Sequence, residues 1–308
     1  MSVGFYYHEQ ERRGLRIRVA HSPDSDDAFM FYALANKKFD TEGIEFENIL
    51  SDIETLNQKA MNGEYEVSAV SIHAYPYIAD KYQMLSSGAS MGDGYGPMVV
   101  SKKPYKIEDI NNLKIAIPGK MTSAFLALSI FAGAFEYEVV PFDQIIDRVL
   151  SDKFDAGLII HEGQLTYGKS GLYNIVDLGA WFKEKFKLPL PLGGNVIRRD
   201  LPEEVKKRVS YYLKKSIAYS LDHREEALKY ALEFARGMNT NLADKFVGMY
   251  VNDWTLDYGK KGREAIQLFL DLAYERNSLT VRCKAEFVET PEDLERCRRS
   301  SACAVKIE

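Results

Sequence analysis

His161 is the side chain in this sequence that is best suited to acid–base chemistry. It follows the apolar run Leu158–Ile160, so it should emerge at the carboxyl end of a buried strand. Open α/β sheets bind their ligands at that edge, and imidazole, with an unperturbed pKa of about 6.5, exchanges protons near neutral pH. We expect His161 to act as a general base in a cleft. The alternative is a histidine that caps the strand and hydrogen-bonds Glu162.

A second candidate site lies where the strand-like segment Lys114–Pro118 gives way to an apolar, helix-forming stretch. Thr122 and Ser123 stand at this point. Either hydroxyl can cap the helix, and the unbonded backbone N–H groups of its first turn, together with the helix dipole, attract a carboxylate or phosphate. The alternative is that Thr122 only caps its own helix. A phosphate-binding P-loop is excluded, because that motif needs glycine at position 114 and a hydroxyl residue directly after the lysine at position 120.

Three carboxylates crowd the turn between the first predicted strand and the first predicted helix. They belong to Asp24, Asp26 and Asp27, in the run Ser22-Pro-Asp-Ser-Asp-Asp27. Clustered carboxylate oxygens can hold a hard cation, but the glycine and the terminal glutamate of a calcium-binding loop are missing. We therefore expect helix capping and a polar cleft wall here, with metal binding as the alternative.

Three further polar residues stand at the ends of predicted strands. Ser71 can place its hydroxyl in the same cleft, whereas His21 and His73 are expected to be structural or to line the cleft. The glycine-rich segment Gly92–Pro97 is not a dinucleotide-binding fingerprint, because it ends in proline and is followed by a β-rich run instead of a helix.

Two successive units of alternating strands and helices should position these side chains. In the first unit the pattern predicts strands at 15–21, 44–50 and 67–72 and helices at 26–39 and 52–62. In the second unit it predicts strands at 98–101, 114–118, 138–140 and 156–160 and helices at 122–134 and 143–151. This alternation favours two sheets of mainly parallel strands with a cleft between them.

The rest of the chain divides the molecule into two interleaved lobes. From Pro202 the sequence is helical, with an apolar residue at every fourth position of 205–221, and such a block must cover a sheet formed earlier. The extended segment Leu188–Arg198 is the strand that carries the chain back. With crossings near Gly96–Met98 and Gly193–Val196, lobe 1 comprises 15–97 and 195–288, lobe 2 comprises 98–194, and 1–14 and 289–308 are terminal extensions.

The composition is that of a globular protein and excludes several other classes. The 308 residues are 46% hydrophobic and 28% charged, which rules out fibrous and disordered chains. The 45 acidic residues outnumber the 40 basic ones, and the formal net charge of −5 leaves no basic field to bind nucleic acid. The basic cluster Lys206–Arg208, beside two glutamates, is expected to lie on a solvated, salt-bridged face.

The cysteines and the hydrophobic segments predict a cytoplasmic protein. Cys283, Cys297 and Cys303 are odd in number, form no CxxC pair and have no histidine among them, which argues against a disulfide framework or a zinc site. The N-terminus has no apolar signal region, and the most apolar stretch, Ala124–Phe135, is too short to span a bilayer. We expect no membrane partner, and the sequence predicts no particular oligomeric state.

Several segments, in their order along the chain, resemble the 1,4-dihydroxy-6-naphthoate synthases of the futalosine route to menaquinone. The resemblance covers about residues 15–288. The segments that carry it are Ser22–Asp27 with Phe29–Leu34, Asp52–Asn57, Val67–Ser71, Gly94–Pro97, Pro118–Thr122, Gly157–Glu162, Val176–Trp181 and Leu188–Gly193.

The resemblance implies both a fold and a reaction. The fold is that of the type II periplasmic solute-binding proteins, an α/β fold with two lobes around a central cleft. The reaction is that of a lyase, which converts cyclic dehypoxanthinyl futalosine, a small carboxylated aromatic substrate, to 1,4-dihydroxy-6-naphthoate without a metal or an organic cofactor. By the same resemblance the proton acceptor is His161, and the substrate contacts are Ala69, Val70, Ser71, Thr122 and Ser123.

Two departures from the family pattern and two rival functions bear on this interpretation. The family often has two threonines where this chain has Thr122 and Ser123, which keeps the hydroxyl donor. It often has the run S-P-C-P-N-D at 22–27, where this chain adds negative charge beside an anionic substrate. An unchanged substrate is the simplest interpretation, and a changed substrate is the alternative. The rivals are chorismate dehydratase, a sister enzyme with the same fold, and a non-catalytic solute-binding protein. The run Leu158–Glu162 favours the naphthoate synthase, and the lack of an export signal counts against transport.

Overall fold

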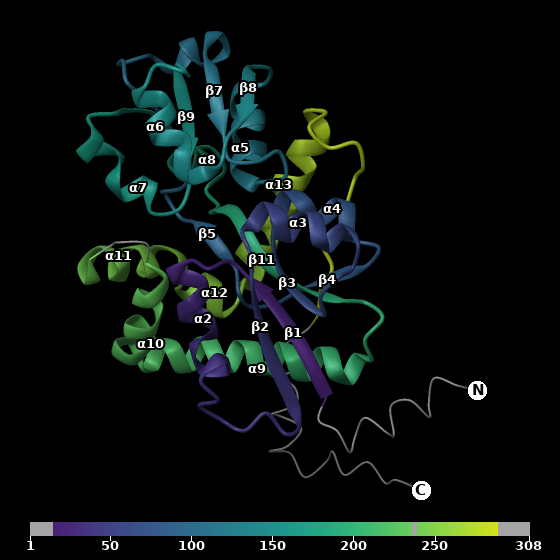
Figure 1. The fold of residues 1–308 in the computed structure, drawn as a ribbon. Coiled ribbons are helices and arrows are strands. Elements are labelled where there is room, and N and C mark those ends of the chain that lie inside the picture. Colours follow the sequence, from purple (N-terminus) through teal and green to yellow (C-terminus); the bar gives the residue numbers. More distant parts are fainter. Residues whose placement is uncertain (1–14, 236–238, 289–308) are drawn as a thin grey trace, which may run out of the picture.

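Two α/β lobes, one above the other in Figure 1, make up the residues that the computed structural model describes, 15–235 and 239–288. The predicted extensions 1–14 and 289–308, with Cys297 and Cys303, lie outside the described residues. Along the chain the strands and α-helices are β1 (Leu15–His21), α2 (Ser25–Ala35), β2 (Ile44–Leu50), α3 (Ile53–Met61), β3 (Val67–Ser71), α4 (Tyr75–Ile78), β4 (Tyr82–Leu85), β5 (Ser90–Gly92), β6 (Met98–Ser101), β7 (Lys114–Ile117), α5 (Ser123–Ala132), β8 (Glu136–Val139), α6 (Ile145–Leu150), β9 (Ala156–Ile159), α7 (Gly163–Thr166), β10 (Tyr173–Asp177), α8 (Leu178–Phe186), β11 (Leu190–Arg198), α9 (Glu203–Asp222), α10 (Arg224–Ala231), α11 (Thr240–Tyr250), α12 (Asp253–Leu256), α13 (Gly259–Glu275) and β12 (Phe287–Val288).

Local sequence explains where several elements begin and end. The strands predicted at 15–21, 44–50 and 98–101 are present with those bounds. Helix α3 begins where expected, because the Asp52 carboxylate accepts a hydrogen bond of 3.0 Å from the N–H of Thr55. Helix α2 ends at Ala35 instead of residue 39, because Lys37 takes a left-handed backbone conformation, with φ +50°, that stops a right-handed helix.

Lobe 1, the lower lobe in Figure 1, is built on a sheet of order β12-β4-β11-β3-β1-β2, with β5 also paired to β11. Strand β1 lies parallel to β2 and β3, in register with β2 from Leu15 opposite Ile44 to His21 opposite Leu50. The parallel arrangement brings the carboxyl ends of β1 and β3 to the same edge of the sheet. Residues 22–27 and 71–73 follow those ends and therefore meet at that edge.

Lobe 2 is built on a smaller sheet of order β10-β6-β9-β7-β8. Strand β7 lies parallel to β8 and β9, and their carboxyl ends point toward lobe 1 (Figure 1). Thr122 and Ser123 lie in the segment that follows β7. His161 lies two residues after the end of β9. Both candidate segments of lobe 2 therefore lie at the edge that faces the first lobe.

Both sheets are mixed, which corrects the prediction of mainly parallel strands. Strand β11 runs antiparallel to β3, β4 and β5, and β6 runs antiparallel to β9 and β10. Strands β6 and β11 are the first strands that the chain forms after it enters a lobe from the other one. Such a strand must run away from the cleft, opposite to the parallel strands, whose carboxyl ends face the cleft.

The chain crosses between the lobes at 93–97, after β5, and at 187–189, before β11. All of β11 lies in the sheet of lobe 1, so the boundary predicted at 194 falls inside this strand. At the first crossing the backbone passes so close to α8 that a Cβ added to Gly179 would lie 1.9 Å from the carbonyl oxygen of Tyr95. Only glycine allows this approach.

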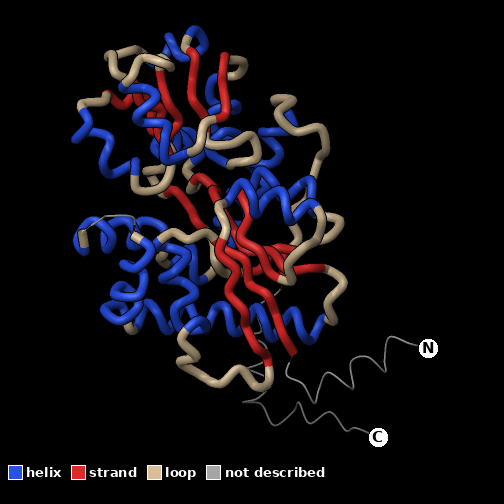
Figure 2. The backbone as a smooth tube through the Cα atoms, viewed as in Figure 1, coloured by secondary structure: helices blue, strands red, loops and turns tan. Residues whose placement is uncertain are grey.

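Helices cover both faces of the lobe 1 sheet (Figure 2). One apolar cluster joins α2, α9, α10 and α11 to one face, which Ile17 and Val19 supply from β1, while Ala20 on the other face packs with Leu56 of α3. The predicted four-residue repeat of α9 is buried in the first cluster at Val209, Leu213 and Ile217. Another cluster extends from α13 into lobe 2 and joins the two lobes.

Lys206 departs from the prediction of a solvated basic face on α9. Its side chain is only 3% exposed, its ammonium group donates a hydrogen bond of 2.8 Å to Gln83 Oε1, and it also pairs with Glu203. The apolar stem of lysine can be buried in this way when the charged end finds partners.

Within 15–235 and 239–288, no helix is both long enough and apolar enough to cross a membrane.

Candidate active site

A cavity of about 780 Å³, its open mouth included, lies between the two lobes. This volume suits a small organic molecule. The segments that follow β1, β3, β7 and β9 all contribute to its wall. The residues singled out from the sequence that line it are Ala69, Val70, Ser71, Thr122, Ser123 and His161, together with Asp24, Asp26 and Asp27 of the acidic turn.

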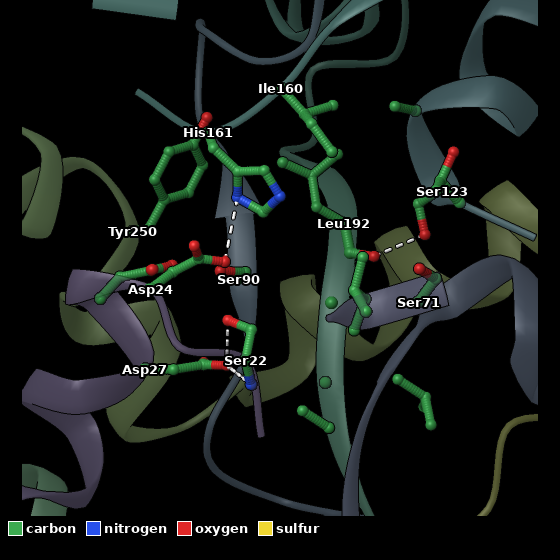
Figure 3. Close-up of a pocket in the computed structure, with 18 of the residues that line it drawn as sticks. Ser22, Asp24, Asp27, Ser71, Ser90, Ser123, Ile160, His161, Leu192 and Tyr250 are labelled. Carbon is green, nitrogen blue, oxygen red and sulfur yellow. Dashed lines mark hydrogen bonds and ion pairs between the residues drawn. The ribbon is translucent and has the colours of Figure 1, made fainter. Parts of the chain in front are cut away.

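His161 extends into this cavity from the segment after β9 (Figure 3). Its Nδ1 atom lies 3.2 Å from Oδ2 of Asp24, and its side chain is 18% exposed. The ring of Phe142 packs edge-on against the imidazole, with 4.9 Å between the ring centroids. The backbone of His161 has φ +56°, a left-handed conformation that is uncommon for residues other than glycine and is enriched at functional sites. The imidazole is thus held in one place from both sides.

Asp24 occupies the N-cap position of α2, but its side chain does not cap the helix. A cap aspartate ordinarily accepts a hydrogen bond from a backbone N–H of the first helical turn. Here the carboxylate is 5% exposed and lies against His161 of the opposite lobe (Figure 3). The predicted capping role is therefore wrong for Asp24, whereas its carboxylate does form part of the cavity wall, as expected.

Asp26 and Asp27 share this turn but have different partners. Asp27 Oδ2 accepts hydrogen bonds of 2.8 Å from both the N–H and the hydroxyl of Ser22, which closes the turn. Burial raises the pKa of Asp27, although His21 and Ser22 act in the opposite direction. Asp26 Oδ1 has no hydrogen-bond partner among the described residues. Burial, followed by the charges of Asp27 and Asp24, raises the pKa of Asp26 well above its usual range, which favours its neutral form.

Thr122 caps its own helix, as the alternative interpretation held. Its hydroxyl accepts a hydrogen bond of 3.2 Å from the N–H of Phe125 and donates one of 2.9 Å to the carbonyl of Gly119. A hydroxyl has a single proton to donate, and that of Thr122 is used within the protein. Thr122 lines the cavity, but its side chain serves the helix.

Ser123 is also bound within the protein. Its hydroxyl donates a hydrogen bond of 2.5 Å to the carbonyl of Leu192 and accepts one of 3.2 Å from the N–H of His73 (Figure 3 draws the first). The backbone N–H groups of Ser123 and Ala124, in contrast, make no hydrogen bond within the described ranges. Both residues line the cavity, so the first turn of α5 presents two donors and its positive dipole end to a ligand.

Ser71 ends β3 on the floor of the cavity, next to the glycine pair of β11. Its N–H donates to Asn57 Oδ1 at 2.9 Å, and its hydroxyl accepts from Asn57 Nδ2 at 3.1 Å, which leaves the hydroxyl proton for a ligand. In the paired strand, Gly193 lies opposite Ser71 and Gly194 opposite Val70. A Cβ on Gly194 would lie 2.5 Å from the hydroxyl of Tyr258, so only glycine fits there.

Three residues of the cavity wall have no signal in the sequence that would have identified them: Tyr250, Gln164 and Asn195. The Tyr250 hydroxyl, from α11 of lobe 1, donates a buried hydrogen bond of 2.6 Å to Oε1 of Gln164, in α7 of lobe 2. Tyr250 belongs to the helical block, where its apolar neighbours indicate only packing. The contact depends on the second lobe and cannot be derived from local sequence.

No group of three or more histidine, cysteine, aspartate or glutamate side chains in the described part of the chain is arranged to hold a metal ion.

Comparison with known proteins adds a family to this geometry. Residues 17–275 match a protein family described as menaquinone biosynthesis. The chain belongs to this family. Two relatives are named 1,4-dihydroxy-6-naphtoate synthase. The one from Thermus thermophilus is 38% identical over 250 residues, 81% of this chain and 91% of the relative. The one from Streptomyces coelicolor is 32% identical over 263 residues, 83% of this chain and 92% of the relative. Family membership and these relatives support an enzyme of menaquinone biosynthesis.

Solved structures confirm the predicted fold class. A crystal structure of a protein from Archaeoglobus fulgidus is 46% identical, with a TM-score of 0.82, over 86% of this chain and 98% of that protein. The alkanesulfonate-binding protein of Xanthomonas axonopodis pv. citri, solved with bound MOPS, is 12% identical, with a TM-score of 0.66, over 88% of this chain and 96% of that one. The second likeness shows the fold alone, which is α/β and like that of periplasmic binding proteins.

Proposed function

We propose that this chain is a lyase that converts cyclic dehypoxanthinyl futalosine to 1,4-dihydroxy-6-naphthoate, with His161 as the general base. One observation carries the proposal: His161 and the N-terminal turn of α5 open into the same cavity between the lobes. A base and an anion-binding helix end are the two groups that proton removal from a carboxylated substrate requires. The names of the two relatives support the choice of reaction.

The cavity has two chemically different sides, which orient such a substrate. At the start of α5, the N–H groups of Ser123 and Ala124 bind the carboxylate of the aromatic part. On the lobe 1 side, Asp26 lines the wall, and its Oδ1, which has no partner among the described residues, accepts a hydrogen bond from a hydroxyl group of the sugar-derived part. This arrangement keeps the substrate carboxylate away from the acidic turn, so the added negative charge at 22–27 selects an orientation.

His161 then removes a proton from the sugar-derived part. The imidazole can do this because Nδ1 faces Asp24, and its other ring nitrogen points away from Asp24 in Figure 3. The lobes together exclude water from the reacting groups, which strengthens the electrostatic interactions of the developing charge. Ser71, with a hydroxyl proton to donate, and the flat backbone of Ala69 and Val70 form the floor on which the substrate lies.

The proposal is tested by incubating the purified protein with cyclic dehypoxanthinyl futalosine and measuring 1,4-dihydroxy-6-naphthoate by liquid chromatography with mass detection. We expect product from the wild type and a large loss in His161→Gln. A parallel reaction with chorismate tests the dehydratase alternative, and calorimetric binding of either compound without turnover would indicate a solute-binding protein. Either of these two outcomes overturns the proposal.

A further inference from the structure

We infer that Asp24 and His161 form a catalytic dyad across the cleft, in which Asp24 is the positioning residue that fixes the tautomer of His161. The inference rests on the proposed function, because it assigns His161 the role of base. It goes further by naming a second residue, on the other lobe, that prepares the base for proton transfer. Asp24 acts through His161 and is not itself required to touch the substrate.

The first support is the geometry of the pair. The 3.2 Å between Asp24 Oδ2 and His161 Nδ1 is an ion-pair contact, and it is short enough for a protonated Nδ1 to donate a hydrogen bond to the carboxylate. With its proton on Nδ1, a neutral imidazole has an unprotonated Nε2, which is the form that accepts a proton. When Nε2 takes the proton, the positive charge forms next to the Asp24 carboxylate, which stabilises it.

The second support is that the Asp24 side chain does not cap the helix that it precedes. The N-cap position of α2 offers this carboxylate the backbone N–H groups of the first turn, and the side chain accepts none of them. Asp52 and Asp177 occupy the same position at α3 and α8, and both accept backbone hydrogen bonds as a cap should. Asp24 is an N-cap aspartate whose carboxylate contacts a histidine of the other lobe instead of the backbone of its own helix. This contact indicates a role for Asp24 at His161.

The third support is the backbone of His161. Its left-handed conformation, with φ +56°, costs free energy that the neighbouring packing must offset. That conformation places the imidazole between Asp24 and the ring of Phe142. Because Asp24 follows β1 and His161 follows β9, the pair exists only when the lobes are together. The base is therefore complete only when the cleft is closed around its contents.

Other charged and titratable groups surround the pair and must be considered in any pH profile. On the lobe 1 turn they are Asp26, Asp27 and His21, near the start of α3 they are Asp52 and Glu54, on α11 it is Tyr250, and beside His161 in the chain it is Glu162. The charge of Asp24 also raises the pKa of Asp26 and Asp27, so a substitution of Asp24 changes the titration of these two carboxyl groups as well. The dyad is therefore tested by the tautomer of His161 and by the double variant with His161→Gln, which report on His161 itself.

The first experiment compares Asp24→Asn with the wild type in the naphthoate assay. We expect kcat to fall on the order of 10- to 10³-fold, with KM changed less than about threefold, because the loss is in the base and not in binding. In a His161→Gln background the same substitution should cost no further activity, because the two residues act as a unit. Additive losses would overturn the dyad.

Asp177→Asn is the matched control. Asp177 is an N-cap aspartate that caps its helix, with bonds of 2.9 and 3.0 Å to the N–H groups of Gly179 and Ala180, and asparagine caps a helix about as well. We expect its kcat and pH profile to match the wild type. Thermal unfolding of all variants shows whether they are folded, so that a loss of activity in Asp24→Asn is not confused with a loss of structure.

A second experiment reads the dyad without any substrate. In ¹⁵N-labelled protein, long-range nitrogen–proton correlation spectra distinguish the two tautomers, and His161→Gln assigns the signal among the five histidines. We expect the Nδ1–H tautomer in the wild type and a mixture of tautomers in Asp24→Ala. If no naphthoate forms at all, the proposed function fails and the tautomer still decides the dyad. An unchanged tautomer in Asp24→Ala would refute the dyad.

Discussion

Two histidines reach across the cleft from equivalent places, and they differ in what they meet there. His73 follows the end of β3 in lobe 1, and its Nδ1 lies 3.3 Å from the carbonyl oxygen of Thr122 in lobe 2. His161 follows β9 in lobe 2, and its Nδ1 lies 3.2 Å from the carboxylate of Asp24 in lobe 1. His73 is 5% exposed, and its burial lowers its pKa to about 4, so it is neutral near pH 7.

The partner atom, more than the residue type or the strand it follows, separates a structural histidine from a chemical one. A backbone carbonyl carries no full charge, so the hydrogen bond to Thr122 raises the pKa of His73 by less than burial lowers it. A carboxylate next to Nδ1 can set the tautomer of an imidazole, as the proposed role of His161 requires. The His73 contact thus holds the lobes together, whereas the proposed base depends on the His161 contact.

The largest expected effect comes from exchanging each histidine for glutamine. His161→Gln should lower kcat about 10²- to 10⁴-fold, the usual contribution of a general base, while substrate affinity stays close to that of the wild type. His73→Gln should change kcat less than about threefold, because the amide can still donate to the Thr122 carbonyl. Steady-state rates of naphthoate formation at saturating substrate measure both.

The opposite pattern would break the comparison. Full activity in His161→Gln, or a loss in His73→Gln as large as the one expected for His161→Gln, would show that the two contacts have been assigned the wrong roles. Circular dichroism and thermal unfolding of both variants serve as the folding control.

The pH dependence of stability sharpens the comparison on the His73 side. The pKa of His73 is about 4 in the folded protein and 6.5 when the imidazole is unperturbed, as in the unfolded chain. Between these two pH values the unfolded chain binds a proton at this residue and the folded protein does not. The stabilising contribution is complete above pH 6.5 and is lost as the pH falls toward 4. A shift of this size corresponds to about 3 kcal/mol. His73→Gln should remove this part of the acid sensitivity, measured as the wild-type minus variant free energy of unfolding in urea from pH 7 to 4. A difference that stays constant over this range would contradict the assignment.

The sequence predicted the frame of the molecule well, because the frame depends on local patterns. Asp52 and Thr122 cap the helices they precede, and strands such as β1 and β6 have their expected bounds. The mixed sheets were missed, because strand direction depends on how β6 and β11 enter a lobe, which no residue near them indicates.

The candidate site was predictable at its strand ends and not across the cleft. His161 and Ser123 line the cavity, since residues after parallel strands gather at one edge. The pairing of Asp24 with His161 and of Tyr250 with Gln164 was missed, because each joins side chains of different lobes. An aspartate before a helix predicts a cap, and only the position of the other lobe shows that this carboxylate has another partner.

The hydrogen bond between Tyr250 and Gln164 supports the His161 side and gives a smaller effect. Gln164 follows His161 by three residues, and the N–H of Gln164 donates to the His161 carbonyl at 3.2 Å. Tyr250→Phe leaves Gln164 Oε1 buried without its donor, which should cost about 1–3 kcal/mol of stability. Tyr258→Phe is the matched control, because the Tyr258 hydroxyl is buried without a partner among the described residues, so its removal should be neutral or stabilising. Chemical denaturation of both variants measures the difference, and equal losses would contradict it.

The smallest effect is expected at Thr122, whose hydroxyl caps α5, because the backbone N–H groups that follow it are the proposed contacts to the substrate. Thr122→Ala removes the cap on the N–H of Phe125 and should cost about 1 kcal/mol of stability, whereas Thr122→Ser keeps a capping hydroxyl and should restore most of it. Neither variant should raise KM more than about twofold, because the proposed contacts to the substrate carboxylate are backbone N–H groups and because the Thr122 carbonyl still accepts from His73. Unfolding curves and KM values decide the point together. A tenfold rise in KM for Thr122→Ala with unchanged stability would mean that the hydroxyl binds the substrate and does not cap the helix. The contact between Thr122 and His73 would then lie next to a substrate-binding group as well as joining the lobes.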